Sequence, residues 1–351
     1  MHSRWHAPGL LALVAALLLL PVAVSLLGLP PRIEAYKSIP TAAGTAGAVI
    51  QSIYQSPPQG DIVFLGSSLL TAGISREAVR NALVEHLHRG VSVQLLAINW
   101  PGLDVQYFML RDYFNAHNAR LLVWNLPEPH ARAYDYPHVQ SYRWLRFGEY
   151  ADALDGLPLS QRPALYGEMV IGAPRQLLSI LRPNLFAGEG ATVDPTLAET
   201  GYQGTKFVPN EASPGMKSRA KLLPLDAREI VVRGPALGSY QMHFARLIAE
   251  LAKKKRCRIV LLHIPTDAEF QDASIPELDD WMTQLGPSHK IIAIPSAQLF
   301  EGMDRTQFDR FYRDAHLNEN GSRYFTQAIL PAMLQAYDEA ANMSVSEVSA
   351  R

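Results

Sequence analysis

Short apolar runs rich in leucine and β-branched residues alternate with segments of helical periodicity along most of this 351-residue chain. The runs lie at residues 61–66, 91–99, 120–125, 258–264 and 290–294, and the helical segments at 74–89, 104–118, 240–255 and 320–341. Apolar strands that alternate with helices are typical of a parallel sheet covered on both faces. The sequence therefore predicts an α/β fold with a five-stranded parallel sheet, and any ligand site beyond the carboxyl ends of its strands.

This alternation stops between about residues 128 and 237, where Pro, Gly and aromatic residues are frequent. Such a stretch is too long for an ordinary connection. We interpret it as an insertion after the third strand of a catalytic domain that spans residues 61–340. Residues 31–60, rich in Pro, Gly, Ala and Ser, are expected to form a linker with a short helix, and residues 341–351 a C-terminal tail.

An uninterrupted apolar stretch without a charge runs from Gly9 to Leu29. As a helix it would be about 30 Å long, enough to cross the hydrocarbon core of a membrane. Arg4 precedes it and favours a cytoplasmic N-terminus. Residues 1–30 are therefore expected to be a membrane anchor, with a cleaved signal segment as the alternative. Either interpretation places the catalytic domain in the periplasm or another extracytoplasmic space.

Charge and cysteine content narrow the classes of partner. Lys and Arg together number 32 and Asp and Glu 33, so no basic surface for nucleic acid is expected. Cys257 is the only cysteine, which excludes an internal disulfide, and no Cys/His spacing indicates a zinc site. We expect neither a metal nor a cofactor.

Small and polar residues follow the first three predicted strands. Ser68 follows the first strand in the segment Gly66-Ser67-Ser68, where a serine can be a nucleophile or simply a helix N-cap. Gly102 follows the second strand and Asn125 the third. A backbone N–H at Gly102 and the Asn125 amide could stabilise an oxyanion, although a turn and a strand-end cap are the simpler explanations.

Asp314 and His316 stand in the segment Asp314-Ala315-His316, just before the last predicted helix. A serine hydroxyl needs a base to remove its proton, and a carboxylate that fixes the tautomer of the base completes the arrangement. The loop can reach the end of the first strand. A loop salt bridge or part of a metal site are the alternatives.

Several other side chains are candidates for substrate contact. Tyr142, Arg143 and Trp144 belong to an aromatic and arginine-rich stretch of the insertion. Aromatic faces stack on sugar rings and arginines suit acidic groups, but the same aromatics could form a small core of the insertion. His263 ends the fourth strand and is a further candidate.

These blocks together resemble the SGNH/GDSL hydrolase superfamily. The match lies in VFLGSSL around Ser68, in Gly102, in Asn125 and in the pair Asp314 and His316, with Ser67 in place of the usual aspartate. The Asp-x-His spacing is similar to that of the alginate O-acetylation proteins, with Leu317 in place of a tryptophan. The resemblance covers about residues 60–127 and 240–335.

This resemblance implies a flavodoxin-like three-layer α/β/α sandwich with the sheet order 2-1-3-4-5. It implies Ser68 as nucleophile, His316 and Asp314 as its base, and an oxyanion hole from Ser68, Gly102 and Asn125. The expected function is an exported serine esterase or O-acetyltransferase that adds or removes O-acetyl groups on a cell-envelope or secreted polysaccharide. A membrane-bound O-acyltransferase is an expected partner. The alternatives are a small-ester hydrolase or lipase, and an inactive scaffold protein of the same fold.

Overall fold

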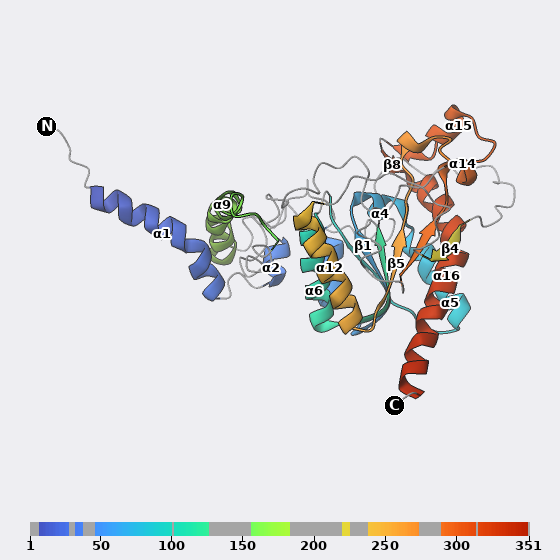
Figure 1. Ribbon diagram of the computed structural model, residues 1–351, viewed down its shortest axis with the longest axis horizontal. Coiled ribbons are helices and arrows are strands. Elements are labelled where there is room, and N and C mark those ends of the chain that lie inside the picture. Colours follow the sequence, from blue (N-terminus) through green and yellow to red (C-terminus); the bar gives the residue numbers. More distant parts are fainter. Residues whose placement is uncertain are drawn as a thin grey trace.

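The computed structural model describes residues 7–27, 32–37, 46–99, 102–125, 156–182, 220–224, 238–273, 289–313 and 315–349 (Figure 1). It has an α/β architecture around a six-stranded, mostly parallel sheet in the order β2-β1-β3-β5-β6-β4. The parallel strands are β1 (Gln59–Gly66), β2 (Val93–Ala97), β3 (Asn118–Asn125), β5 (Arg258–Leu262) and β6 (Lys290–Ala293). Each overlaps one of the five predicted runs, so the mostly parallel α/β fold is confirmed.

The sixth strand, β4 (Lys221–Pro224), lies antiparallel on the outer edge of β6. It belongs to the segment that we predicted as an insertion, and the sequence did not reveal it. Only four residues form it, too few to show a periodic pattern. Its pairing partner, residues 290–293, lies about seventy positions further along the chain.

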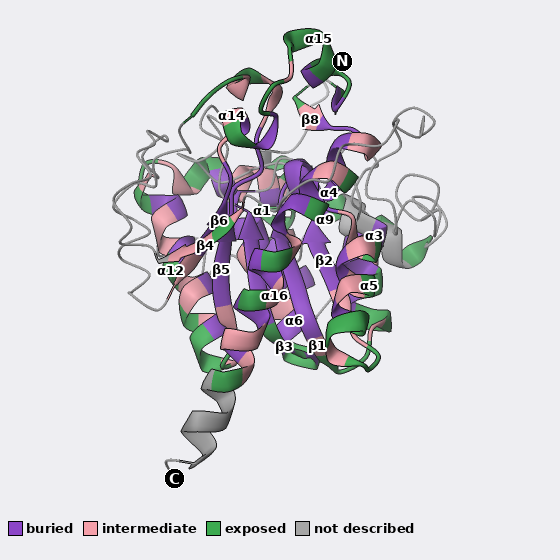
Figure 2. Ribbon diagram, turned by 90° about the vertical axis from the view of Figure 1, so that its right-hand side faces the viewer, coloured by how far each residue is buried: buried purple, intermediate pink, exposed green. Residues whose placement is uncertain are grey.

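Helices cover the two faces of the sheet (Figure 2). On one face α4 (Ser68–Gly73), α5 (Arg76–Leu87) and α16 (Glu319–Ser349) surround a core that includes Ile62 and Phe64 of β1. On the other face α6 (Leu103–Ala116) and α12 (Ser239–Lys254) surround a core with Val63 and Leu65. Successive side chains of one strand thus enter opposite cores, which explains why the strand sequences are continuously apolar.

The predicted helix at 74–89 corresponds to α5, and the separate short helix α4, which ends at Gly73, precedes it. The hydroxyl of Ser75 caps α5 by accepting the backbone N–H of Ala78 at 3.3 Å. His88 ends α5 in the left-handed conformation, with φ of 52°.

Part of the segment predicted as a linker belongs to the folded core. It contains α2 (Arg32–Lys37), α3 (Ala46–Ile50) and the π-helix η2 (Gln51–Gln55). The side chains of Tyr36, Val49 and Ile53 are buried in the α6 and α12 core. The Tyr36 hydroxyl donates to the Asp112 carboxylate of α6 at 2.8 Å. The composition of residues 31–60 is typical of a linker, but contacts with α6 and α12 bury part of this segment.

The N-terminal apolar stretch forms the helix α1 (Ala7–Leu26), which extends away from the sheet in Figure 1. Its leucine side chains are largely exposed; Leu10 and Leu19, for example, are 66% and 62% exposed. The helix α9 (Arg162–Leu181) packs beside it, and the Tyr166 hydroxyl donates to the backbone oxygen of Leu18. Among the described residues, no helix is both long enough and apolar enough to cross a membrane.

Candidate active site

Two serines follow β1, and they have different local roles. Ser67 is the N-cap of α4, because its backbone is extended and its hydroxyl accepts the N–H of Leu69 at 3.2 Å. Ser68 is the first residue of that helix. The ordinary capping role that a serine can have at such a turn is therefore taken by Ser67, which leaves the Ser68 hydroxyl for another partner.

That partner is His316. Its Nε2 atom lies 2.8 Å from the Ser68 Oγ, a normal hydrogen-bond distance between groups 248 positions apart in the chain. His316 belongs to β8 (His316–Leu317), which pairs with β7 (Tyr312–Arg313) in a small hairpin. Only 8% of the Ser68 surface is exposed, and His316 is partly buried. The hairpin thus brings the His316 imidazole to the Ser68 hydroxyl at the carboxyl end of β1.

This contact has a definite chemical requirement. For Nε2 to accept the Ser68 proton, the neutral imidazole must carry its own proton on Nδ1. A carboxylate that accepts the Nδ1 proton would fix this tautomer. Asp314, the predicted carboxylate, lies outside the described residues. The described residues therefore include the hydroxyl and the imidazole of the predicted arrangement.

Asn125 ends β3 directly beside β1. The Ser67 hydroxyl lies 3.2 Å from its Oδ1 atom, and the side chain is buried. Gly66 makes this approach possible, since a Cβ at that position would lie 2.6 Å from the Asn125 Cβ. Any larger residue at position 66 would displace Asn125. Of the predicted oxyanion donors, Asn125 is thus held next to the serine pair.

Gly102 lies at the start of α6 as its N-cap. A Cβ there would lie 2.2 Å from the Asp104 Oδ1 and 3.1 Å from the Gln241 Nε2, so there is no room for a side chain. Gln241 also accepts the Leu103 N–H at 2.6 Å. The α12 helix therefore fixes the turn after β2. The atoms nearest to a Cβ at position 102 belong to Asp104 and Gln241.

Asn318 holds the hairpin that carries His316. Its amide donates to the backbone oxygens of Arg310 at 2.8 Å and Tyr312 at 3.4 Å. Its Oδ1 accepts the Gly321 N–H at 3.0 Å, which caps α16. One buried side chain thus connects the segment before β7, the residue after β8 and the last helix. This connection limits the movement of His316 relative to the sheet.

His263 has a partner of its own. Its Nε2 lies 2.9 Å from the Glu269 Oε2, and only 3% of its surface is exposed. Burial raises the pKa of the Glu269 carboxyl, but the hydrogen bonds from His263 and Thr266 outweigh burial and leave the pKa below its ordinary value. The geometry gives His263 a role in holding the loop after β5, and the substrate contact predicted for it stays a prediction.

This loop also touches the hairpin. The Tyr312 hydroxyl donates to the backbone oxygen of Pro265 at 3.2 Å. Burial, and then the nearby Glu269 and Asp267 carboxylates, raise the pKa of Tyr312 well above its ordinary value, so the hydroxyl keeps its proton. The loop after β5 is therefore bonded directly to β7.

Tyr142, Arg143 and Trp144, the predicted substrate contacts of the insertion, lie outside the described residues. Within the described parts of the chain, no group of three or more His, Cys, Asp or Glu side chains could hold a metal ion. Cys257 is buried, and burial raises the pKa of its thiol.

Sequence reasoning missed three residues that shape the site, namely Ser67 as an orienting group, Glu269 and Asn318. The role of Asn318 could have been predicted from the sequence, because an asparagine directly before a helical segment is typical of an N-cap. The contacts of Ser67 and Glu269 depend on tertiary structure. No protein-family model matches this chain, and no curated protein sequence matches it.

Proposed function

We propose that this protein is an exported serine esterase or O-acyltransferase, in which Ser68 forms an acyl-enzyme with His316 as general base. The observation that carries the proposal is the 2.8 Å contact between the Ser68 Oγ and the His316 Nε2. A serine and a histidine placed by distant parts of the chain at the carboxyl end of a parallel sheet are typical of nucleophilic catalysis.

The reaction has two balanced steps. His316 takes the proton of Ser68 as Oγ attacks the ester carbonyl, and the resulting tetrahedral oxyanion collapses with loss of the alcohol, which receives that proton. Water or a second hydroxyl then attacks the acyl-serine, again with proton transfer through His316. The acid or the new ester leaves and Ser68 is restored. The predicted role of Asp314 is to keep the Nδ1 proton in place.

The oxyanion forms on the substrate carbonyl that Ser68 attacks, and it needs hydrogen-bond donors close to that oxygen. The N–H of Ser68 is one of the first in α4, and such groups lack an intrahelical partner. Asn125 is a second donor in this proposal, supported by its position beside Ser67. Gly102 is the third predicted donor, and its support comes from the resemblance and its place after β2.

The flavodoxin-like three-layer sandwich and the polysaccharide substrate are parts of this proposal. Helices on both faces and the strand order of the parallel part of the sheet support the first. The acetylated cell-envelope polysaccharide and the membrane-bound O-acyltransferase partner rest on the resemblance. A membrane location rests on the exposed leucines of α1, and the exposed Ile171 and Leu181 of the adjoining α9 extend that apolar surface.

The full chain, purified in mild detergent, tests the reaction with an aryl acetate as substrate. We expect acetate release that Ser68→Ala and His316→Ala each reduce by about a thousandfold or more. Retention of turnover in Ser68→Ala would contradict the nucleophile assignment. Thr71→Ser, a conservative change within the same helix, serves as the folding control.

An acceptor distinguishes the two enzyme classes. If the protein transfers the acetyl group to an added oligosaccharide faster than to water, it is a transferase. If acetate alone forms, it is an esterase. Absence of turnover with every ester, in a folded protein that still binds polysaccharide, would favour the scaffold alternative. Extraction of membranes at high pH tests the location, since a protein held by α1 should stay with the lipid.

A further inference from the structure

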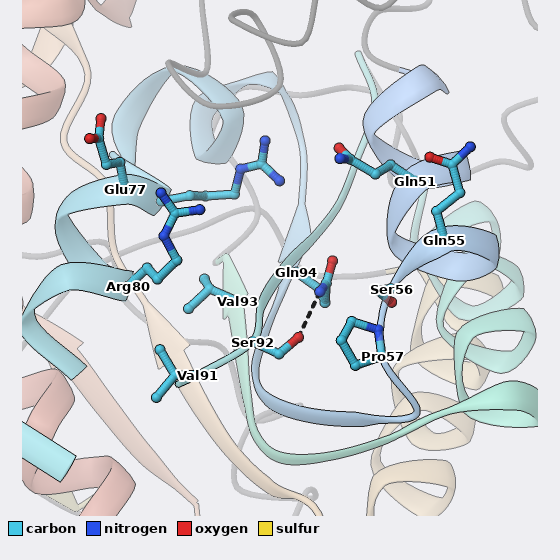
Figure 3. Close-up of a pocket in the computed structure, with 11 residues that line it drawn as sticks. Gln51, Gln55, Ser56, Pro57, Glu77, Arg80, Val91, Ser92, Val93 and Gln94 are labelled. Atoms are coloured by element: carbon cyan, nitrogen blue, oxygen red, sulfur yellow. Dashed lines mark hydrogen bonds between the residues drawn. The ribbon is translucent and has the colours of Figure 1, made fainter. Parts of the chain in front are cut away.

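A pocket of about 250 Å³ lies at the free edge of β2, between η2 and α5 (Figure 3). Gln51 and Gln55 of η2 form one wall, and Glu77 and Arg80 of α5 form the other. Neither Ser68, Asn125 nor His316 lines it. The pocket is therefore separate from the candidate active site.

Its lining is rich in unused hydrogen-bonding groups. The guanidinium of Arg80, the amides of Gln51 and Gln55 and the carboxylate of Glu77 make no hydrogen bond or ion pair with any other group of this protein that the structure describes. Arg76 adds a second guanidinium to the same lining. The Arg80 guanidinium, which has no partner among the described residues, favours an anionic group in the ligand.

The floor of the pocket adds backbone groups. The Ser52 hydroxyl binds both the N–H and the C=O of Leu95, at 3.2 Å and 3.1 Å, so Leu95 directs these groups away from β1. Residues two apart in a strand point their backbone groups to the same side. Val93, which lines the pocket, therefore also directs its N–H and C=O outward, at an edge where no other described strand pairs with β2.

Ser52 also limits what can bind. By occupying Leu95, it stops an incoming strand from pairing along the whole edge of β2. A long peptide added as a seventh strand is thus disfavoured, and a small molecule fits better. Such a molecule needs acceptors for Arg80, Gln51 and Gln55, and donors for the Val93 carbonyl and the Glu77 carboxylate.

We propose that this pocket binds a small polyhydroxylated carboxylate, the chemistry of a sugar acid. The carboxylate pairs with the guanidinium of Arg80, because a planar guanidinium matches two carboxylate oxygens. The hydroxyl groups bond to the glutamine amides, Glu77 and the Val93 backbone. Ligand binding at this site does not involve Ser68, so the proposal can be tested separately from the proposed function.

Calorimetric titration of the full chain with gluconate tests the proposal. Sorbitol is the matched neutral probe, acetate lacks the hydroxyls, and inorganic phosphate is a bare oxyanion. We expect saturable gluconate binding, at least tenfold weaker binding of the other three, and at least a tenfold loss of gluconate affinity in Arg80→Gln. Ser68→Ala should bind gluconate like the wild type, and Arg80→Gln should hydrolyse the aryl acetate normally.

Lys253→Gln, an exposed charge change on α12, is the control and should not alter gluconate affinity. Thermal unfolding of Arg80→Gln should match the wild type, since no described residue depends on that guanidinium. The proposal is overturned if gluconate does not saturate the protein, or if Arg80→Gln binds it unchanged. It is likewise overturned if sorbitol or phosphate binds as tightly as gluconate.

Discussion

The Ser67 hydroxyl lies 3.2 Å from the Oδ1 atom of Asn125, so the two serines after β1 act on different neighbours. The Ser67 oxygen already accepts the Leu69 N–H, and its single proton is available for Asn125. The Asn125 oxygen accepts this proton, which leaves its NH₂ group turned away from Ser67. One hydroxyl thus caps α4 and orients an amide of the proposed oxyanion hole.

Replacement of Ser67 separates these two roles. Ser67→Ala should lose about 1 kcal/mol of stability through loss of the cap, and ester hydrolysis should fall about tenfold or more. Ser67→Asp should recover the stability, because aspartate caps helices well, but not the activity, because a carboxylate has no proton for Asn125. Chemical unfolding and initial rates measure the two effects. Full activity in Ser67→Asp would show that the amide is not oriented in this way.

Asp314 is the predicted orienting carboxylate of His316. Asp314→Asn should lower kcat by about a thousandfold, because the amide no longer favours the Nδ1-protonated tautomer. Asp309→Asn is a suitable comparison, since the Asp309 side chain is 53% exposed and pairs with Arg305 on the surface. Steady-state rates with an aryl acetate measure both. If the two variants lose equal activity, Asp314 has no special role.

Asn318 is expected to position His316 without touching substrate. Asn318→Ala removes the bonds to Arg310, Tyr312 and Gly321 and should cost about 2 kcal/mol of stability. Asn318→Asp keeps the acceptor for Gly321 but loses the donors for the hairpin. At a temperature where both are folded, kcat should fall about tenfold to a hundredfold, with KM nearly unchanged. An unchanged kcat would limit Asn318 to a stabilising role.

Asp61 makes stability depend on pH. It accepts hydrogen bonds from Arg89 at 2.5 Å, from the Tyr337 hydroxyl at 2.6 Å and from the Ser92 N–H at 2.9 Å. Burial raises the pKa of the Asp61 carboxyl, but these bonds outweigh burial and hold it below the ordinary value. Burial and the bond to Asp61 raise the pKa of Tyr337 to about 12, so this donor keeps its proton.

The pKa of the Asp61 carboxyl is lower in the folded than in the unfolded protein. Its contribution to the free energy of unfolding is therefore complete above the unfolded pKa of about 3.9, and it is lost as the pH falls through the pKa of the folded state. Asp61→Asn should therefore lower the free energy of unfolding by about 2 kcal/mol at neutral pH. The difference from wild type should shrink below about pH 4. Denaturant titrations at several pH values measure it. Asp338→Asn, at a carboxylate that is 47% exposed, should show little such change.

The parallel strands and the Ser68–His316 contact could be anticipated from sequence because both follow from local signals. Each strand of the parallel sheet is a short apolar run, and the carboxyl ends of such strands lie at one edge. Ser68 follows such a run, and His316 lies just before the last helix. The proximity of the two then required only that the final loop return to this edge.

The features that the sequence did not predict depend on contacts between distant segments. Leu222 and Leu223 of β4 become strand residues only through pairing with β6. Tyr36 and Ile53 lie in a segment with the composition of a linker, and α6 and α12 provide the surface that buries them. The division of roles between Ser67 and Ser68 required the position of Asn125, which no local pattern contains.

The last helix, α16, has a consequence for when the proposed active site can form. Its first turn is fixed by Asn318, beside His316, and further along it Tyr337 binds Asp61 near the start of β1. A chain emerging from the ribosome carries Ser68 long before His316. In the proposed enzyme, Ser68 therefore has no base until the final segment has joined the sheet.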